Sequence, residues 1–493
     1  MRPSPEDLPD PMAEPPGAIR SGSLAGKTMW AAIWFLAIPI LIQQILVACV
    51  GLADKIFAGA LPDEIVLATM DAIGIGSYIG WFIAIAVSGV GIGAQALIAR
   101  SMGSGNVEEG HKILGQSLTL AFVWGIVVGF ALWHFAAPLG DLCQLSGAAK
   151  VYLIQYMRVL ALGMPACGVM TAGAMALHGS GDTFRPALVT VVVNIVNVFV
   201  SWSLSGADVR FGGSVLSNPF TWDLHVIGIA IGTATAYIVG AVLIVGVLLR
   251  GIKDLKLRVG DLVPDRKLFW RIARIGIPNF FEGLSMWAAN LVVLQFIGQI
   301  SVKMANKLGD GEPVAQGLQG ANMIAGQWES FSYLPGFAIG IAAGTLAGQY
   351  LGAGNVKQAR KAVIACTGLA VLFMGSLGLV MIFAGSTLTA IISSEPIHLE
   401  LVPKLLLIAG ISQGGFAVMM VVRHALKGAG DTKWTFLITS FSSWIIRLPA
   451  AWYLGVHLEL GLVGIWYALC GELFIRAALF CIRFQQGGWV KSI

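Results

Sequence analysis

Long apolar runs dominate this chain, and short polar or charged stretches separate them. A run of about 20 apolar residues can cross a bilayer as a helix. Inside a membrane every backbone polar group needs a partner within the chain, so runs of this length predict helices rather than a barrel. The predicted membrane helices cover residues 30–60, 65–99, 113–137, 152–177, 186–206, 225–249, a seventh from about 268, 320–349, 361–391, 400–425, 434–455 and 460–484.

Two blocks of sequence occur twice with the same spacing. Gly179-Ser-Gly-Asp-Thr183 returns as Gly428-Ala-Gly-Asp-Thr432, and Gly103-Ser-Gly-Asn106 returns as Gly352-Ala-Gly-Asn355, each 249 positions later. Separate blocks that share one offset indicate a duplicated unit of about 240 residues. Six helices per unit give both halves the same orientation, so the predicted repeat axis runs along the membrane normal.

The predicted fold is therefore an all-α polytopic membrane protein with twelve transmembrane helices in two six-helix lobes. Residues 30–249 form the first lobe and residues 268–484 the second, joined by a cytoplasmic linker over 250–267. Residues 1–26 contain six prolines and no apolar core of a signal peptide, so residues 1–29 are expected to be a disordered cytoplasmic tail. Residues 485–493 form the second tail.

The repeated glycine-rich motifs are interpreted as connectors between helices. Glycine permits a positive φ and a tight turn, and the Asp and Thr of each Gly-Asp-Thr turn are expected to cap the following helix. The Gly-rich turn at residue 103 lacks the Lys-Ser/Thr of a phosphate-binding loop, and no Walker motif occurs in the chain. An ATP-driven pump is therefore not expected.

Composition supports a membrane protein and the distribution of charge sets its orientation. Hydrophobic residues make up 57% of the chain and charged residues 12%, whereas soluble domains carry about 25% charged residues. The tails and the loops on their side hold 22 Lys and Arg residues, and the opposite side holds seven. The positive-inside rule then predicts that both termini are cytoplasmic, in a multi-pass protein of the plasma membrane, or of the inner membrane in a Gram-negative cell.

Polar residues within the apolar runs are the candidate functional residues, because they are costly in a membrane. In the first half these are Asp54, Asn194, Asn197 and Gln43. Asp54 is predicted to bind the coupling ion, with Asn194 and Asn197 facing it from the fifth helix. The alternatives are an ion pair between Asp54 and Lys55, and a purely structural role for the two asparagines.

In the second half the candidates form a substrate site. Glu282 follows Pro278 by four residues, as Gln43 follows Pro39, so the two halves place polar groups at equivalent points. We expect Glu282 to be short of partners and to attract lipophilic cations. The further members of this predicted site are Met286, Glu329 and Tyr333. Pairing of Glu329 with Arg447 is the alternative, and Arg423, Glu472 and Arg476 are assigned to helix ends, where snorkelling suffices.

At this point the chain resembles the multidrug and toxic compound extrusion (MATE) family. The resemblance rests on the six-plus-six helices, the twin Gly-x-Gly-Asn and Gly-x-Gly-Asp-Thr motifs, the segment Ala53-Asp54-Lys-Ile-Phe-Ala-Gly59, and Arg447-Leu-Pro449. It implies a central cavity that opens alternately to each side, and export of organic cations against inward H⁺ or Na⁺. Relatives often carry an Asp four residues after an Asn on the fifth helix. Val198 stands four after Asn194 here, which leaves one clear carboxylate in the first half and favours H⁺.

The predicted function is secondary active multidrug export by a monomer, with small organic cations and the bilayer as partners, no nucleic acid, and no cofactor beyond the coupling ion. Protonation of Asp54 is expected to repack the first helix, so that proton and drug compete through conformation. Two alternatives remain. A lipid-linked saccharide flippase would need several cations in its cavity. A membrane-embedded enzyme would need clustered catalytic or metal-binding groups, whereas the seven histidines are dispersed.

Overall fold

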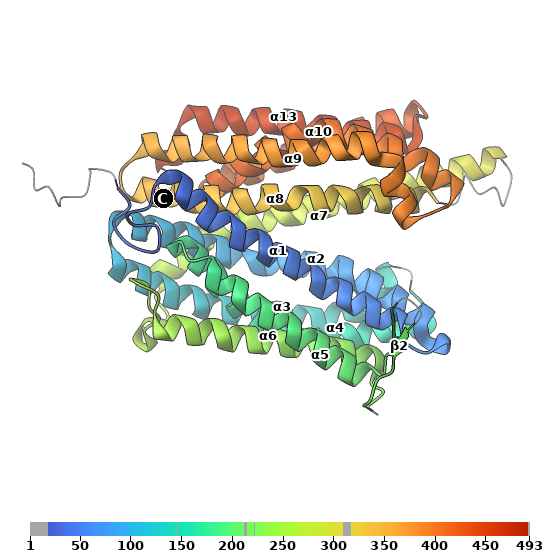
Figure 1. Cartoon of the computed structure of the whole chain (residues 1–493), viewed down its shortest axis with the longest axis horizontal. Coiled ribbons are helices and arrows are strands. Elements are labelled where there is room, and N and C mark those ends of the chain that lie inside the picture. Colours follow the sequence, from blue (N-terminus) through green and yellow to red (C-terminus); the bar gives the residue numbers. More distant parts are fainter. Residues whose placement is uncertain (1–17, 144, 212–213, 221, 309–316, 492–493) are drawn as a thin grey trace, which may run out of the picture.

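The structure, a computed structural model of the whole chain, describes residues 18–143, 145–211, 214–220, 222–308 and 317–491 (Figure 1). The first lobe contains α1 (Met29–Gly59), α2 (Asp63–Ser104), α3 (Val107–Leu142), α4 (Gly147–Ser180), α5 (Phe184–Ser205) and α6 (His225–Arg250). The second contains α7 (Arg266–Leu308), α8 (Leu318–Gly352), α9 (Val356–Ile392), α10 (Pro396–Gly428) and α13 (Gly461–Gln486), with a further helical path over 432–457. A short hairpin, β1 (Val209–Phe211) and β2 (Ser214–Leu216), connects α5 to α6.

The predicted all-helical, two-lobe architecture is confirmed. Within the described residues, eleven helices are long and apolar enough to cross a membrane. Most of them are longer than the predicted spans. α7 has 43 residues, and at 1.5 Å per residue it is about 64 Å long, twice the thickness of the hydrocarbon core. This helix is therefore longer than a single crossing of the bilayer requires.

The helical path over 432–457 differs from the regular helix predicted over 434–455. It consists of α11 (Thr432–Phe441), the π-helical η3 (Ser442–Arg447), α12 (Leu448–Ala451) and the π-helical η4 (Trp452–His457). Pro449 lies just beyond the first π-helical turn and supplies no N–H to the preceding turn. Hydrophobic periodicity predicts a helix here, but it does not reveal the wider turns that a missing donor permits.

Helix α1 belongs to both lobes. Its first half packs through Ile33, Leu36 and Ala37 into one apolar cluster with α8, α9 and α10 of the second lobe. Its last half places Phe57 and Ala58 in the core of the first lobe. Figure 1 shows α1 crossing diagonally between the two lobes. The first lobe was predicted to begin at residue 30, but the first half of α1 packs in the second lobe.

The two lobes meet closely at the end of the bundle where the C-terminus lies, called here the terminal end (Figure 1). A Cβ on Gly103 of α2 would lie 1.9 Å from the carbonyl oxygen of Gln349, and a Cβ on Gly352 of α8 would lie 2.1 Å from that of Arg100. These contacts are equivalent under the 249-residue offset. Gln349 also donates from Nε2 to the Gly179 carbonyl over 2.8 Å. The terminal end is therefore closed, and two of the repeated glycines are packing positions.

The second glycine of each repeated motif forms a turn, whereas only Asp182 makes one of the caps expected after the Gly-Asp-Thr turns in the described residues, and Thr183 donates to the Phe35 carbonyl instead. Gly105, Gly181, Gly354 and Gly430 all have positive φ. Asn106 and Asn355 cap α3 and α9 by accepting from Glu109 N and Gln358 N, and Asp182 accepts from Arg185 N at the start of α5. Asp431 makes no such cap and pairs instead with Arg483 of α13, with 2.8 Å between Oδ2 and Nε.

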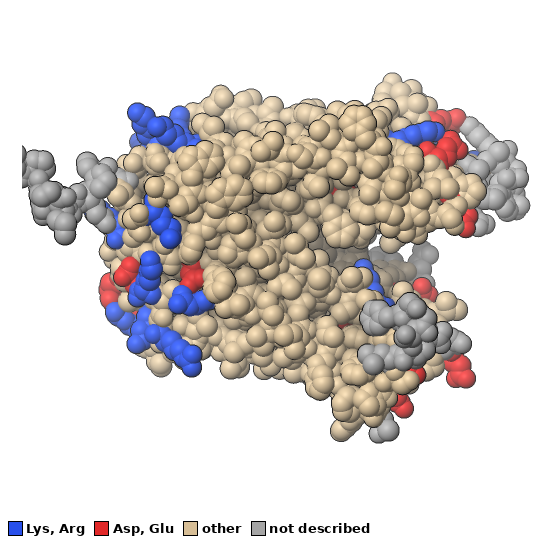
Figure 2. All heavy atoms as spheres, viewed as in Figure 1, with Lys and Arg blue, Asp and Glu red and all other residues tan. Residues whose placement is uncertain are grey.

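At the opposite end, called the far end, the lobes separate. Figure 2 shows the surface hollowed between them at that end. The same view shows Lys and Arg gathered at the terminal end, while Asp and Glu prevail at the far end. In the described residues, the two lobes therefore enclose a cleft that is closed at the terminal end and open at the far end.

The segments predicted to be tails and a linker are only partly so. Residues 1–17 lie outside the described residues, and their disorder stays a prediction. From residue 18 the chain is packed: Leu24 is 1% exposed, and Ser23 N donates to the Ser180 carbonyl over 3.1 Å. The linker contains the short helix η2 (Val259–Leu262), and its Asp261 and Val263 carbonyls accept from Gln116 of α3. The first segment is fixed by the buried Leu24 side chain and a backbone hydrogen bond, and the linker is fixed because it offers carbonyls to the buried Gln116 side chain.

Candidate functional site

Asp54 lies in a closed polar pocket within the first lobe. Only 5% of the residue is exposed. Its Oδ2 accepts from the Tyr156 hydroxyl of α4 at 3.3 Å and from the Thr233 hydroxyl of α6 at 3.1 Å, and its Oδ1 accepts from Asn197 Nδ2 of α5 at 3.4 Å. Four helices therefore converge on one carboxylate.

No cation balances the charge of Asp54 within the described part of the chain. The neighbouring Lys55 is exposed on the other side of α1, so the alternative ion pair does not form. Asn197 Nδ2 also donates to Thr233 at 2.9 Å, while Asn197 Oδ1 is buried without a hydrogen-bond partner. The pocket therefore holds a carboxylate, two hydroxyls and an amide that still has an unused acceptor.

The two asparagines predicted beside Asp54 behave differently. Asn197 faces Asp54, whereas Asn194 donates to the Thr190 carbonyl of its own helix over 2.9 Å. The two asparagines lie almost one turn apart on α5, and only Asn197 reaches Asp54. The position one turn beyond the contacting asparagine is therefore Ser201 rather than Val198. Ser201 donates to the Ile229 carbonyl, so the pocket has a single carboxylate either way.

Glu282 lies in a charged cluster of the second lobe, not in a position short of partners. Its Oε1 lies 3.3 Å from Arg423 Nη1 and its Oε2 lies 3.0 Å from Lys427 Nζ. Thr435 and Thr439 of α11 donate to the two oxygens at 3.0 and 3.3 Å. The expectation that Glu282 lacks partners is therefore wrong, because α10 places two cations one turn apart on the face that meets α7.

The environment of Glu282 limits what it can bind. Its side chain is 1% exposed, and those of Arg423 and Lys427 are 13% and 10% exposed. The predicted neighbour Met286 contacts Arg423 Nη1 through its sulfur at 3.5 Å. The cluster combines two cations with one carboxylate, so its net charge is positive.

The first lobe has an uncharged equivalent of this cluster. Gln43 Oε1 lies 3.1 Å from His178 Nε2. Gln43 is the counterpart of Glu282, because each follows its proline by four residues. His178 is the counterpart of Lys427 under the 249-residue offset. The same contact between the first and fourth helices of each lobe is therefore neutral in one lobe and ionic in the other.

Glu329 is the carboxylate that lacks a fixed partner. It is half-buried on α8, and within the described residues its carboxylate makes no hydrogen bond or ion pair. Tyr333 lies one turn further on the same face and packs on Phe337 and Phe416, with ring centroids 6.4 Å away in each case. The alternative that Glu329 pairs with Arg447 is not realised, because Arg447 is engaged elsewhere.

Arg447 belongs to a buried network around Glu472 of α13. Its Nη2 lies 2.8 Å from Glu472 Oε2, and Arg476 Nε lies 2.7 Å from Oε1. Ser442 also donates to Glu472, and Arg476 donates from Nη2 to Ser443 at 2.9 Å. The assignment of Glu472 and Arg476 to snorkelling helix ends is therefore wrong: Arg476 is 0% exposed. The π-helical turn η3 supplies both serines and Arg447.

Sequence reasoning missed Tyr156, Thr233, Arg423 and Lys427. A hydroxyl inside an apolar run gives no signal until its helix neighbours are known. Arg423 was assigned to a helix end, and Lys427 was not singled out, because both lie near the end of α10. The repeat carried the missing signal, since Lys427 is the counterpart of His178, which stands at the contact with α1.

The sequence of this chain matches those of known proteins. The MatE family model matches residues 39–203 and 287–453, one match in each lobe and about two thirds of the chain in all. The probable multidrug resistance protein NorM of Thermotoga maritima is 26% identical over 461 residues, with 92% of each chain covered. The multidrug resistance protein PmpM of Pseudomonas aeruginosa is 24% identical over 465 residues, covering 92% of this chain and 90% of that protein.

Solved structures show the same fold. A MATE protein in the bent conformation superposes with a TM-score of 0.81 at 19% identity, covering 94% of this chain and 97% of that one. An outward-facing multidrug resistance MATE family transporter superposes with a TM-score of 0.80 at 19% identity, covering 95% and 98%. Both alignments extend over both lobes.

Proposed function

The chain belongs to the MatE family of multidrug efflux transporters, and we propose that it exports organic cations in exchange for protons that enter through Asp54. Alternating access is the proposed mechanism: the cleft opens at the far end in one state and at the terminal end in the other. The protein is proposed to act as a monomer and to need no cofactor other than the coupling ion.

The observation that carries this proposal is the pocket of Asp54. A buried carboxylate without a cationic partner is strained in its charged form, and burial favours the neutral acid. Every group that touches it is an alcohol, a phenol or an amide, and each of these can either donate or accept a hydrogen bond. The pocket can therefore satisfy both the ionised and the protonated carboxyl.

Asn197 gives this switch a specific geometry. Its Nδ2 now faces Asp54, and its Oδ1 is buried without a donor. When Asp54 gains a proton it becomes a donor, and a half-turn of the amide brings the unused oxygen to meet it. The orphaned acceptor is thus explained by a second state of the same pocket. Protons need no more than this, whereas Na⁺ prefers several oxygen ligands.

Helix α1 can transmit the change between lobes. Asp54 lies in its far half, which packs in the first lobe, and its other half packs on the second lobe. Pro39 lies between the two halves and leaves one carbonyl without its helical partner. Repacking around Asp54 therefore changes a helix that both lobes hold. Because Asp54 and the substrate site lie in different lobes, proton and drug compete through conformation.

Transport in proteoliposomes tests the coupling ion. The purified protein is reconstituted with a fluorescent lipophilic cation, and a pH gradient and a Na⁺ gradient are imposed separately. Export driven by the pH gradient and indifferent to Na⁺ is the expected result. Transport that follows Na⁺ and ignores pH contradicts the proposal.

Asp54→Asn tests the carrier. This variant mimics the protonated acid, so binding of the dye is expected within about twofold of wild type while export under a pH gradient falls by about 100-fold, a loss of about 2.7 kcal/mol in coupling. Asn194→Ala is the matched control, because Asn194 bonds only to its own helix. Export by Asp54→Asn at the wild-type rate contradicts the assignment.

Glu329 and Tyr333 are proposed as the substrate contacts in place of Glu282. Glu329 is an unpaired carboxylate, and the Tyr333, Phe337 and Phe416 rings beside it suit planar cations. Glu282 is proposed to organise α7, α10 and α11 instead.

A second candidate substrate class is favoured by Arg423 and Lys427. Two cations with one carboxylate leave one net positive charge inside the second lobe, and a lipid-linked saccharide flippase would need several cations in its cavity. An anionic dye in the same proteoliposome experiment separates the two. Competition by anionic and not cationic compounds would replace the cation exporter with this alternative.

We propose the predicted orientation as well, with the terminal end in the cytoplasm, on the strength of the Lys and Arg gathered there (Figure 2). Single cysteines at residue 20 and in the 253–265 segment are expected to resist membrane-impermeant reagents added to intact cells. Labelling of either from outside contradicts this orientation.

A further inference from the structure

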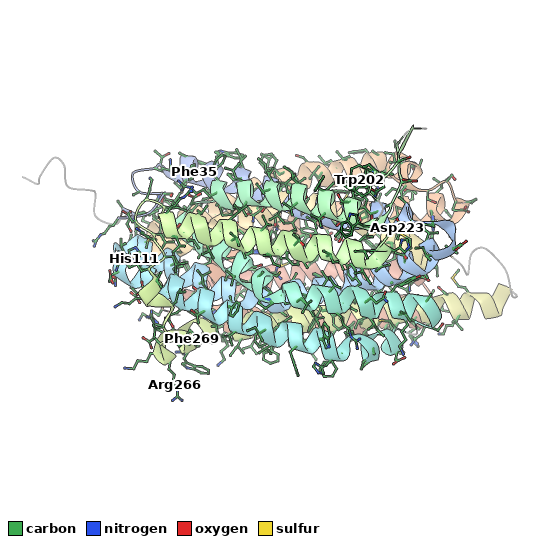
Figure 3. All side chains as sticks on the ribbon, turned by 90° about the horizontal axis from the view of Figure 1, so that it is seen from below. Phe35, His111, Trp202, Asp223, Arg266 and Phe269 are labelled. Carbon is green, nitrogen blue, oxygen red and sulfur yellow. The ribbon has the colours of Figure 1, made fainter. Side chains whose placement is uncertain are left out.

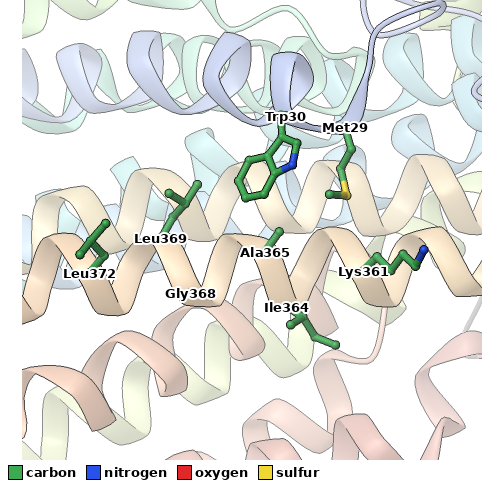
Figure 4. A pocket seen from close by; sticks show the side chains of 8 residues that line it. All are labelled: Met29, Trp30, Lys361, Ile364, Ala365, Gly368, Leu369 and Leu372. Carbon is green, nitrogen blue, oxygen red and sulfur yellow. The ribbon is translucent and has the colours of Figure 1, made fainter.

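Two grooves open sideways from the seams between the lobes at the terminal end. The first, of about 470 Å³, lies between the start of α1, at Met29 and Trp30, and the face of α9 around Gly368 (Figure 4). The second, of about 790 Å³, lies between Leu120 of α3 and the start of α7, at Phe269 and Trp270. Figure 3 shows Arg266 and Phe269 at that second seam.

The internal repeat relates the two grooves. Leu120 in one is the counterpart of Leu369 in the other, 249 residues later. Phe269 is the counterpart of Trp30 under the offset that relates Pro39 to Pro278. Each groove therefore joins the first helix of one lobe to the third helix of the other. Two lobes of different sequence therefore place a groove at equivalent positions.

The lining of each groove combines apolar walls with a cation at the membrane surface. Ile364 and Leu372 in the first are 64% and 62% exposed, and Trp270 in the second is 64% exposed, so these walls face the lipid. Lys361 lines the first groove, and Arg266 and Lys267 line the second. None of these three cations forms a side-chain ion pair within the described residues. Exposed tryptophans beside cations are typical of the headgroup level of a membrane.

From this we propose that each seam binds one anionic phospholipid, with an acyl chain in the groove and the headgroup phosphate on Lys361 at one seam and on Arg266 and Lys267 at the other. Charge complementarity selects a headgroup with net negative charge, and each nearby Lys or Arg contributes about 1 kcal/mol at a membrane surface, or about fivefold in affinity.

The lipids would act on the lobes themselves. Both seams join helices of different lobes, so each groove changes shape when the lobes rotate, and a chain held in it stabilises the arrangement with the terminal end closed. This consequence rests on the proposed alternating access, whereas the binding of lipid does not.

Direct counting of bound lipids tests the proposal. The full-length protein is stripped of lipid in detergent, mixed with equal amounts of phosphatidylglycerol and phosphatidylcholine with the same acyl chains, and weighed by native mass spectrometry. Two bound phosphatidylglycerol molecules, favoured at least about fivefold over phosphatidylcholine, are expected. No preference between the two lipids overturns the proposal.

Variants assign each lipid to its seam. Lys361→Gln should remove one phosphatidylglycerol, and Arg266→Gln with Lys267→Gln should remove the other. Each variant keeps one seam intact, which reports on its folding. Lys404→Gln is the control, because Lys404 is equally exposed but pairs with Glu400 where α10 begins. Identical lipid counts for Lys361→Gln and Lys404→Gln overturn the assignment.

Filling the first groove tests the contribution of the acyl chain separately from that of the headgroup. A Cβ on Gly368 meets nothing within 4 Å, so Gly368→Leu is expected to fold. Its side chain should displace the acyl chain of phosphatidylglycerol and of phosphatidylcholine alike from the first groove. Gly246→Leu on α6 is the matched control, since its Cβ also meets nothing within 4 Å. If Gly368→Leu still binds two phospholipid molecules, no acyl chain lies in this groove. Because no transport is measured, failure here leaves the proposed antiport untouched.

Discussion

Asp54 in the first lobe accepts hydrogen bonds from a phenol, an alcohol and an amide, whereas Glu282 in the second accepts them from a guanidinium, an ammonium and two alcohols. Both carboxylates are buried and both lie on the first helix of their lobe. The neutral groups can reverse their roles as donors and acceptors, while Arg and Lys only donate. One pocket therefore tolerates a change of charge, and the other requires an ionised carboxylate.

The contrast extends to the position that the repeat makes equivalent. Gln43 meets His178 in the first lobe, where Glu282 meets Lys427 in the second. A duplicated fold thus supports a neutral pair and an ionic cluster at one contact. The comparison shows that burial alone does not identify an ion-coupling residue, since the neighbours decide whether a second protonation state is accessible.

The largest expected effect is on stability, and it separates the two carboxylates. Glu282→Gln leaves Arg423 and Lys427 buried without a counter-charge, and the free energy of unfolding should fall by about 3–5 kcal/mol. Asp54→Asn removes an uncompensated charge and should change stability by less than about 1 kcal/mol. Denaturant titration followed by tryptophan fluorescence measures both. Equal losses would break the comparison.

A double substitution sharpens it. Lys427→Met in the Glu282→Gln background removes one stranded cation, so it should restore about 1–3 kcal/mol of what the single change lost. The same titration measures the coupling. If the double variant is less stable than the wild type by the sum of the two single effects, the two side chains do not form an interdependent cluster.

Where the lobes are equivalent, substitutions should have equal effects. Gly103→Ala and Gly352→Ala each place a Cβ against a backbone carbonyl at the terminal end, and each should weaken closure there by about 1–3 kcal/mol. Spin labels across that end report the fraction of closed molecules. Gly246→Ala is the control. Opening by only one of the two variants would show that the closure is not symmetric.

The smallest expected effect concerns the substrate. Glu329→Gln removes one partly exposed charge and should weaken binding of a cationic dye about fivefold, or about 1 kcal/mol, with no change for a neutral dye of similar size. Fluorescence titration of purified protein measures both dyes. If the neutral dye loses affinity equally, the effect is one of shape, and Glu329 is not the counter-ion.

Sequence reasoning was most successful where the physics is local. Apolar length predicts the helices, the fixed offset predicts the two lobes, and glycine and aspartate chemistry predicts the turns at Gly181 and Gly430 and the cap that Asp182 makes. The candidate carboxylates were also found from sequence, because a charge within an apolar run is costly wherever it lies.

The partners of those carboxylates could not be predicted in the same way. Periodicity states which face of a helix is polar, but the neighbour opposite that face depends on how helices pack. Glu282 and Glu329 were both expected to attract cations, but the structure pairs Glu282 with Arg423 and Lys427, and only Glu329 has no ion pair among the described residues. The π-helical turn at Ser442–Arg447 adds a local shift of register that no hydrophobic pattern encodes.

The dual membership of α1 has a consequence for how the protein is made. Ile33, Leu36 and Ala37 are among the first membrane residues synthesised, yet the cluster that buries them includes Ala342 and Ala343 of α8 and Ala362 and Val363 of α9. At about 5–20 residues per second, the ribosome produces those partners only about 15–60 s later. During that interval α1 must wait in the bilayer with half of its contacts unmade. The first lobe expressed alone should therefore be an incomplete folding unit, and its maturation should depend on translation of the second.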